Sequence, residues 1–564
     1  MRSRSRFSTD VAVLLLLAAV VWITHFLYSS SFGLYEDDWY RVAKVAGLSG
    51  TDFFSLLRTT FSFSATQGRP FHPALIYLLS YIGFKIGGLE FIYVIAFSIL
   101  TANCILFYFL LKRFFPPRFA FLGAMAFATF PADTTQAFLT HALGIQPSIL
   151  LLLVAMHLYL SARRPASYMC ILLSLLMYET AFFVFMVVPF CVRFRKSEFV
   201  RHITIMATIF LCVVLVRMAS TESHISHIGY RELLLGGANI LAGPLTSLAM
   251  FVYRPGEVLA TLSLRQGLIL VSAALGVFTI AALRLHRAPV VVAATTPPQA
   301  LLIGGMMLTF AYILTFTTVG IAVGGRGTRV HSAAILGASV ICAWLCSTVL
   351  DRAISRYGRI LSRVAIACFF TLLIDFGMNV QSDYVVGWKE EQGFWSTVEQ
   401  LCPDIDDGTV IFVEPTGLRD TRQLLFLRSD LTGVPNTRQI KSLDSLYDVL
   451  PEIFKFPPSW TPPRVYRLPL NWRDNIFAGQ GKLRVLSIEE GFSYVPTGAE
   501  VSSSRVIFLE TKNGTLTRLG TLRDQAGTEL ELKSVPTLLP RLEETAIGRY
   551  LLLPPDQISD YLVK

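Results

Sequence analysis

The chain has 564 residues, of which 53% are hydrophobic and only 16% are charged, and its mean hydropathy is +0.54. Soluble globular proteins rarely combine these values. The formal net charge is +10, but the cations lie in short segments between apolar runs, where signals for membrane orientation belong. The composition therefore predicts a polytopic membrane protein in a lipid bilayer and excludes nucleic acid as a partner.

The first apolar run, 11–28, follows a start that contains three arginines, and no small-residue cleavage site comes after it. We therefore expect an uncleaved first span with the N-terminus in the cytoplasm. The acidic triplet Glu36, Asp37 and Asp38 follows this span. Three adjacent carboxylates are hydrated at a water-facing edge rather than buried in lipid, so the triplet is predicted to lie outside.

Basic clusters set the topology of the later runs, because short cytoplasmic loops are rich in lysine and arginine. The stretch 71–87 is interpreted as a helix at the outer surface or dipping into it. The run 168–191 has basic flanks on both sides, so it is split into two short helices that meet on the outer side. About eleven transmembrane helices result, at 11–28, 89–111, 119–132, 146–161, 168–178, 180–191, 202–219, 266–283, 300–322, 332–350 and 364–380.

This topology leaves four notable outer segments, 29–88, 131–136, 220–265 and 324–329. After about residue 381, charges, prolines and turn signals increase and no further run could span the membrane. We expect a transmembrane domain over 1–380 and an extracytoplasmic α/β domain over 381–564. In the second domain, the pattern predicts strands at 410–413 and 506–509, a hairpin turn at 513–514, and helices at 396–401 and 443–453.

Candidate acids lie in the first two outer segments. A carboxylate at a low-dielectric edge can have a raised pKa and can accept a proton from a hydroxyl. Asp37 and Asp38 fit this description, and Asp133 adds an acid to the second segment. A solvated charged loop explains the triplet as well, and a helix cap explains Asp133.

Candidate phosphate-binding residues are Arg69, Arg326 and Arg329, because the planar guanidinium donates two hydrogen bonds at once. Arginine is disfavoured on the outer side, so these residues call for a partner, either a substrate or ordinary lipid headgroups. Glu179 could orient an arginine or be a solvated turn residue, and His72 follows Arg69 closely.

The eight cysteines and nine histidines show no zinc spacing, and seven of the cysteines fall inside apolar runs. We predict buried apolar cysteines, no disulfide framework and no metal site. No cofactor is certain, and use of a divalent cation is left open.

The order of these motifs on one side of the membrane resembles the GT-C superfamily of membrane glycosyltransferases, closest to bacterial O-antigen glucosyltransferases and protein mannosyltransferase-like proteins. The similarity covers about residues 1–380. The matching motifs are Tyr35-Glu36-Asp37-Asp38-Trp39-Tyr40-Arg41, Gly68-Arg69-Pro70, Lys112-Arg113-Phe114-Phe115, Phe130-Pro131 with Asp133, and Tyr178-Glu179-Thr180.

The resemblance implies a hexosyl- or pentosyltransferase in the bacterial cytoplasmic membrane. Its donor would be a polyprenyl-phosphate-linked sugar, its acceptor a hydroxyl on a cell-surface glycan, lipid or protein, and the transfer would invert the anomeric carbon. The implied site has Asp37 or Asp38 as base, Asp133 as second acid, Arg69, Arg326 and Arg329 on the donor phosphate, and Glu36, Glu179 and His72 in support.

Two other functions compete with this interpretation. A transporter or flippase of a lipid-linked glycan should carry ionisable residues near mid-membrane, but charges within the predicted spans are few, Asp375 being one. No internal repeat is visible, which also disfavours a transporter. A scaffold or sensor whose outer domain binds glycan is the third hypothesis.

Overall fold

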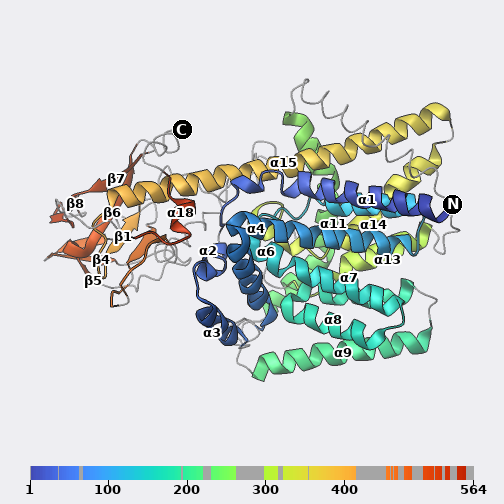
Figure 1. Cartoon of the computed structure of the whole chain (residues 1–564), viewed down its shortest axis with the longest axis horizontal. Helices are drawn as coiled ribbons and strands as arrows, with labels where there is room; N and C mark the ends of the chain where they lie inside the picture. The colour runs from blue at the N-terminus through green and yellow to red at the C-terminus, as the bar shows by residue number, and fades with distance from the viewer. Residues whose placement is uncertain are drawn as a thin grey trace. The chain divides into compact units, whose positions relative to one another are not determined.

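The computed structural model describes residues 2–35, 37–61, 68–191, 195–219, 230–261, 297–315, 322–353, 355–413, 453–457, 459–461, 463–467, 476–479, 481–485, 500–512, 515–523, 527–533 and 543–553. The chain divides into two compact units (Figure 1). The first comprises Met1–Ser30 and Gly50–Ser382, and the second comprises Ser31–Ser49 and Asp383–Lys564. The second unit therefore contains the acidic segment after the first span as well as the C-terminal region.

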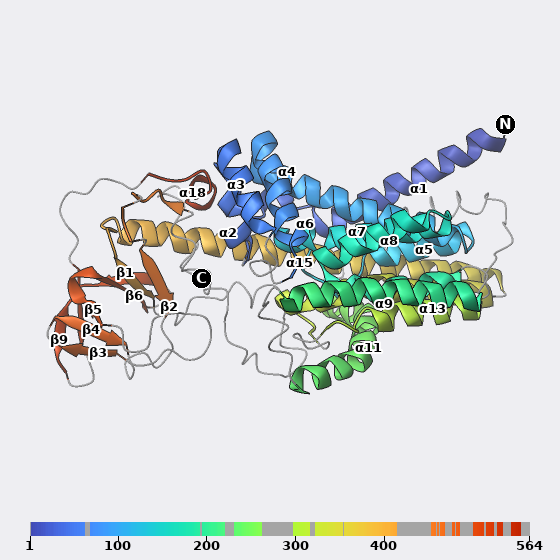
Figure 2. The ribbon, with the colours of Figure 1, turned by 90° about the horizontal axis from the view of Figure 1, so that it is seen from below.

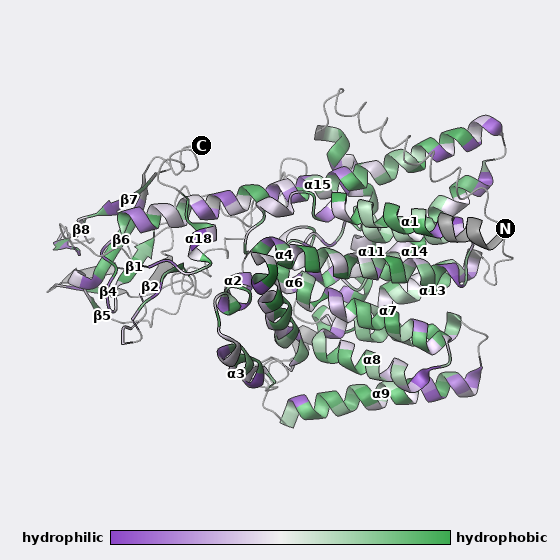
Figure 3. Cartoon of the chain, viewed as in Figure 1, coloured by the Kyte–Doolittle hydropathy of each residue, from purple (hydrophilic) through white to green (hydrophobic). Residues whose placement is uncertain are grey.

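The first unit is a bundle of apolar helices. Seven of the described helices are long and apolar enough to cross a membrane, and four shorter apolar helices accompany them. Hydrophobic residues run along most of α7, α8 and α9, as the hydropathy colouring shows (Figure 3). The helices of the bundle are α1 (Arg2–His25), α3 (Gly50–Thr60), α4 (Phe71–Lys112), α5 (Pro117–Ala128), α6 (Leu139–Gly144), α7 (Gln146–Leu160), α8 (Arg164–Met177), α9 (Lys196–Ala219), α11 (Tyr230–Thr261), α13 (Pro297–Phe310), α14 (Ile335–Arg352), most of α15 (Arg356–Leu401), and the 3-10 helices η3 (Glu179–Cys191) and η4 (Gly325–His331).

The helix α5 is almost entirely buried, since every residue from Phe119 to Ala128 is buried. It packs against α4 on one side and α14 on the other, and α14 in turn packs against α13. Next to α4 lies α7, followed by α8, and Figure 1 shows these helices side by side. The polar loop after α5 thus begins at the centre of the bundle.

Two predicted breaks in the apolar runs are confirmed. The helix α4 contains non-helical backbone at Gly87 and Gly88, where Gly88 has φ +70° and ψ −154°. That conformation is readily open only to glycine, so two helices meet there. The run 168–191 is interrupted at Tyr178, which is extended, between α8 and η3. The second of these short helices is 3-10 rather than α.

The prediction that 220–265 is an outer loop was wrong over most of its length, because α11 covers residues 230–261. The part Leu234–Ala260 is apolar enough to cross a membrane. Two internal prolines and Arg254 had concealed it in the sequence. The charge of Arg254 is compensated by Glu257 one turn away, with Nη1 and Oε2 2.5 Å apart.

The second unit contains a mixed sheet whose strand order is β2-β1-β6-β7. The central strand β1 (Val410–Val413) pairs in parallel with β2 (Arg464–Arg467) and β6 (Val506–Lys512). The strand β7 (Thr515–Leu519) returns antiparallel to β6, with Lys512 opposite Thr515. The strands predicted at 410–413 and 506–509 are confirmed as β1 and the first part of β6. The antiparallel pairing of β6 with β7 is that of a hairpin.

Smaller elements complete this unit (Figure 2). A three-stranded sheet has the order β3 (Ile476–Gly479), β4 (Lys482–Val485), β5 (Glu500–Ser502), and β8 (Thr521–Arg523) pairs with β9 (Glu529–Glu531). The short helices are α2 (Asp37–Arg41), the 3-10 turn η2 (Ala43–Val45) and α18 (Gly548–Leu551). The predicted helix 396–401 is confirmed as the end of α15.

Three sequence predictions fall on residues outside the described part of the chain. They are the span 266–283, the turn residues 513–514, and the helix 443–453 except for its last residue.

Candidate functional site

Asp133 lies in the loop that connects α5 to α6, and its side chain is buried with 4% exposure. Its Oδ1 accepts hydrogen bonds from the Thr135 backbone N–H at 3.0 Å and from the Thr135 hydroxyl at 2.6 Å. Its Oδ2 accepts one from Gln136 Nε2 at 3.3 Å. Burial raises the pKa of Asp133 to about 6, although the Thr135 bonds oppose the shift.

An amide network fixes this loop to the bundle. Gln146 Nε2, at the start of α7, donates to Gln136 Oε1 at 3.3 Å. Asn103 Nδ2, on α4, donates to Gln146 Oε1 at 3.1 Å and to the Gln146 carbonyl at 3.0 Å. The carboxylate of Asp133 is therefore oriented through two membrane helices, as a functional side chain in a rigid scaffold would be.

The loop of Asp133 is held against the arginine-bearing turn η4. The Thr134 backbone N–H donates to Thr328 Oγ1 at 3.1 Å, and the two threonine hydroxyl oxygens are 2.9 Å apart. Thr328 also donates to the Gly325 carbonyl at 2.9 Å. Arg329 belongs to the same turn and is partly buried. The side chain of Arg326 lies outside the described part of the structure.

The turn η4 is fixed on its other side by a buried polar triad. The hydroxyl of Tyr312 lies 2.6 Å from His331 Nδ1 and 2.5 Å from Ser247 Oγ. His331 Nε2 lies 2.8 Å from the Ala322 carbonyl. Ser247 comes from α11, so the helix that the sequence did not reveal carries one of the anchors of the turn.

A second polar cluster of the first unit joins Arg69 to Glu179. Arg69 Nε donates to Glu179 Oε2 at 2.7 Å, and Nη2 of the same guanidinium pairs with Oε1. The guanidinium also lies over the Tyr178 ring, 4.9 Å from its centroid. The structure thus brings Arg69 and Glu179 together, with Glu179 in the orienting position that the sequence allowed for it.

Arg217, on α9, is a member of this cluster that sequence reasoning missed. Its side chain lies against Gly68, where a Cβ atom would come 2.0 Å from Arg217 Nε, and it interacts electrostatically with Glu179. The available signal was an arginine in the last turn of an otherwise apolar helix. Two guanidinium groups and one carboxylate give these three side chains a net charge of +1.

His72 connects this cluster to the helix that follows the Asp133 loop. Its ring packs against Gly144, the last residue of α6, where a Cβ atom would come 2.3 Å from His72 Cε1. The ring centroids of His72 and Tyr178 are 6.1 Å apart. Within the first unit, α6 therefore adjoins both the acid-bearing loop and the Arg69 cluster.

The acidic triplet belongs to the second unit, where its members differ in environment. Asp38 is fully buried, and its Oδ2 accepts the Tyr35 backbone N–H at 3.2 Å. The Asp38 N–H donates back to the Tyr35 carbonyl at 3.0 Å. These reciprocal bonds stabilise the start of α2, as a helix cap does. Asp37 is half-buried at the first position of α2, and Glu36 lies outside the described residues.

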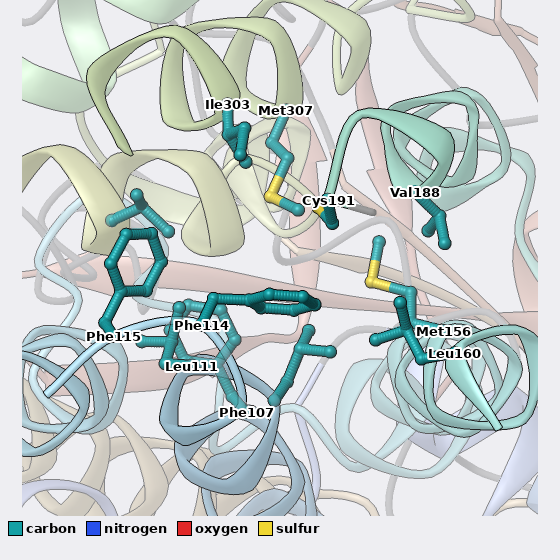
Figure 4. Close-up of a pocket in the computed structure, with 12 residues that line it drawn as sticks. Phe107, Leu111, Phe114, Phe115, Met156, Leu160, Val188, Cys191, Ile303 and Met307 are labelled. Atoms are coloured by element: carbon teal, nitrogen blue, oxygen red, sulfur yellow. The ribbon is translucent and has the colours of Figure 1, made fainter. Parts of the chain in front are cut away.

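Two further features of the described residues are the arrangement of possible metal ligands and an apolar cavity in the bundle. In the part of the chain that the structure describes, no group of three or more His, Cys, Asp or Glu residues could hold a metal ion. The cavity has a volume of about 20 Å³ and is lined by apolar side chains and Cys191 (Figure 4). Phe107, Met156 and Met307 point toward one another across it.

No protein-family model and no curated protein sequence matches this chain. Solved structures that resemble it include two glycosyltransferases with the GT-C fold. ArnT from Cupriavidus metallidurans, bound to undecaprenyl phosphate, is 12% identical, with a TM-score of 0.41, 82% of this chain covered and 93% of that chain. The Archaeoglobus fulgidus oligosaccharyltransferase, tethered to an acceptor peptide, is 14% identical, with a TM-score of 0.35, 71% of this chain covered and 61% of that chain.

The chain spans less than two thirds of the oligosaccharyltransferase. Both TM-scores are below 0.5. What the chain itself shows is a polytopic helical membrane fold followed by a C-terminal α/β region.

Proposed function

We propose that this protein is an inverting membrane glycosyltransferase that moves a hexose or pentose from a polyprenyl-phosphate carrier to an acceptor hydroxyl. The observation that carries the proposal is the pair of Thr134–Thr328 hydrogen bonds. They hold a buried carboxylate with a raised pKa beside a turn that contains two arginines. An ordinary solvated loop, or arginines that only meet lipid headgroups, would need neither the burial nor the junction.

In the proposed reaction, arginine side chains bind the phosphate of the donor. Polyprenyl phosphate is a good leaving group that needs little protonation, so fixed positive charges are sufficient to stabilise it. Arg69 and Arg217 beside Glu179 supply such charges, with the Arg69 fork oriented by the carboxylate. Arg326 and Arg329 contribute the guanidinium groups of η4. The carrier's tail stays in lipid while its phosphate reaches these groups.

In the proposed reaction, a carboxylate activates the acceptor. A carboxylate takes the proton of the acceptor hydroxyl while the hydroxyl oxygen attacks the anomeric carbon. The bond between that carbon and the phosphate oxygen breaks, and the phosphate leaves with the bonding electrons. We assign this base to Asp37, because Asp38 is fully buried and occupied by the cap of α2. Asp133 is the second acid. His72 and Glu179 support the donor side, and the acceptor is a glycan, lipid or protein.

We further propose that the protein resides in the bacterial cytoplasmic membrane with its N-terminus inside and the second unit outside. Three arginines at the N-terminal end of α1 favour this orientation. Because α11 is an apolar helix, the side of the membrane on which each loop after residue 219 lies depends on residues 262–296, which are outside the described residues. Cysteine labelling of Asp52→Cys and Lys44→Cys from each side of sealed vesicles tests the orientation of the first outer segment.

The test of the function is a transfer assay with purified full-length protein. Undecaprenyl-phosphate-linked hexoses and pentoses are incubated with it and a membrane glycan extract, and products are resolved by mass. A glycosyltransferase releases undecaprenyl phosphate from one of these donors and adds one sugar mass to an acceptor. Transport of the intact lipid-linked sugar across proteoliposomes, without release of undecaprenyl phosphate, would establish the flippase alternative instead.

A further inference from the structure

The segment that carries Asp37 and Asp38 is folded against the end of α15, as part of the second unit. Phe32, Leu34, Tyr35 and Trp39 are buried there. The rings of Trp39 and Trp388 are stacked with centroids 6.2 Å apart. An acidic loop that was only solvated would not bury four large apolar side chains just before and after its carboxylates.

The contact is close enough to depend on one glycine. A Cβ atom on Gly33 would lie 1.8 Å from the ring of Trp388, which is far too close for two non-bonded atoms. The Gly33 N–H donates to the Tyr35 hydroxyl at 3.2 Å, and that hydroxyl donates to the Tyr384 carbonyl at 2.9 Å. The backbone before Asp37 is thus attached to α15 by packing and by hydrogen bonds.

The same end of α15 is attached to the C-terminal region. The Leu553 N–H donates to Ser396 Oγ at 2.7 Å, and Gln392 Nε2 donates to the Tyr550 carbonyl at 3.0 Å. Arg518, on β7, donates to the Leu401 carbonyl at 3.0 Å. One chain of contacts therefore runs from the β-sheet through the last turns of α15 to the acidic segment.

We propose that the C-terminal region is a positioning domain for Asp37, acting through Tyr384 and Trp388, rather than a separate acceptor-binding module. This inference rests on the proposed function, in which Asp37 is the base. Tyr384 and Trp388 are positioning residues, because they fix the backbone from residue 33 to residue 39 and do not take part in proton transfer. The side chain of Asp38 completes the support by capping α2 from within the segment.

The first experiment uses Gly33→Ala in the full chain, with Gly50→Ala as the matched control. At Gly50 the nearest atom to an added Cβ is 3.9 Å away, so that variant should behave as wild type. We expect Gly33→Ala to lower kcat about 100-fold, the cost of misplacing a reacting group by about 1 Å, while KM for the undecaprenyl-phosphate sugar changes less than about threefold. Wild-type kcat in a folded Gly33→Ala protein would overturn the proposal.

A double variant separates positioning from general damage. Trp388→Ala removes the ring that the new methyl group meets, so Gly33→Ala should cost nothing more in that background. If the two losses multiply instead, the Gly33–Trp388 contact does not transmit the effect and the proposal fails.

Tyr35→Phe is a milder variant that keeps the ring and removes only the bridging hydroxyl. We expect it to lower kcat several-fold, and unchanged kcat would count against the proposal.

A readout without substrate distinguishes this inference from the function on which it rests. Trypsin cleavage after Arg41 and Lys44 should become faster in Gly33→Ala and Trp388→Ala, and should stay slow in Gly50→Ala. If Asp37→Asn retains full turnover, the assignment of the base fails whatever the protease shows. If Asp37→Asn is inactive while Gly33→Ala has neither faster cleavage nor lower kcat, only the positioning role fails.

Discussion

Two arginine–carboxylate pairs, one in each unit, show how the same chemistry serves different ends. In the second unit, Arg518 donates to both oxygens of Asp404 and to two backbone carbonyls, and its side chain is 8% exposed. In the first unit, Arg69 and Glu179 are 24% and 15% exposed, and a second guanidinium, that of Arg217, adjoins them. A closed pair stabilises a fold, whereas a more open, net-positive cluster can accept an anion.

Breaking the closed pair should have the largest effect, and the effect should be on folding. Arg518→Ala leaves the Asp404 carboxylate buried without its partner, which costs about 3–5 kcal/mol. We expect a much lower yield of folded protein and a large drop in the unfolding temperature in detergent. Arg523→Ala is the control, because its pair with Glu529 is exposed and contributes little. Equal unfolding temperatures for the two variants would contradict the assignment.

Breaking the open pair should instead affect turnover. Arg69→Ala removes the oriented fork beside the proposed donor phosphate and should lower kcat/KM about 100-fold, while the protein still folds. Arg118→Ala, which breaks an exposed pair with Asp351, is the matched control and should leave kcat/KM unchanged. Loss of folded protein in Arg69→Ala, with normal specific activity in the remainder, would make this pair structural as well.

The buried acid of the first unit, Asp133, should make the stability of the protein depend on pH. Burial raises the pKa of Asp133 to about 6, above the value of about 4 in an unfolded chain. The folded state therefore holds the proton more tightly. The contribution of Asp133 to the free energy of unfolding is full below pH 4 and is lost as the pH rises through 6, by about 2–3 kcal/mol in all. The stability difference between wild type and Asp133→Asn, from thermal unfolding at pH 4 to 8, should follow that curve. A difference independent of pH would contradict it.

The smallest effect is expected at the junction of the Asp133 loop with η4. Thr328→Val keeps the shape and removes the hydroxyl that bonds Thr134, at a cost of about 1 kcal/mol, so kcat/KM should fall about fivefold. Thr348→Val, whose hydroxyl bonds only its own helix, is the control. If both variants kept wild-type kcat/KM, the junction would not orient the two loops.

Local signals in the sequence predicted much of this fold. The strands around Ile411 and Ile507 were visible because β-branched and aromatic residues cluster there between turn signals. The break at Gly87-Gly88 and the split at Tyr178 followed from the requirement that basic flanks stay on one side. In each case the signal lies in the predicted segment itself or at its ends.

The missed features depend on partners far away in the chain. Thr134 and Thr328 are 194 positions apart and belong to no motif. Arg217 has the pattern of an ordinary helix end, and α11 was hidden by Arg254, whose charge is compensated by Glu257 one turn away. The packing of Gly33 on Trp388 joins the first outer segment to α15. Hydropathy cannot anticipate it, because a hydropathy pattern carries no information on which distant segments touch.

The assignment of Asp37 as the base is tested by comparing Asp37→Asn with Asp52→Asn, which changes an exposed acid in the same outer segment. Both proteins are assayed for sugar transfer from the active undecaprenyl-phosphate donor, and binding of undecaprenyl phosphate is measured alongside. We expect Asp37→Asn to lose about 1,000-fold in turnover, because a positioned proton-transfer group is lost, while it still binds the carrier. Asp52→Asn should match wild type. Undiminished transfer by Asp37→Asn would contradict the central claim.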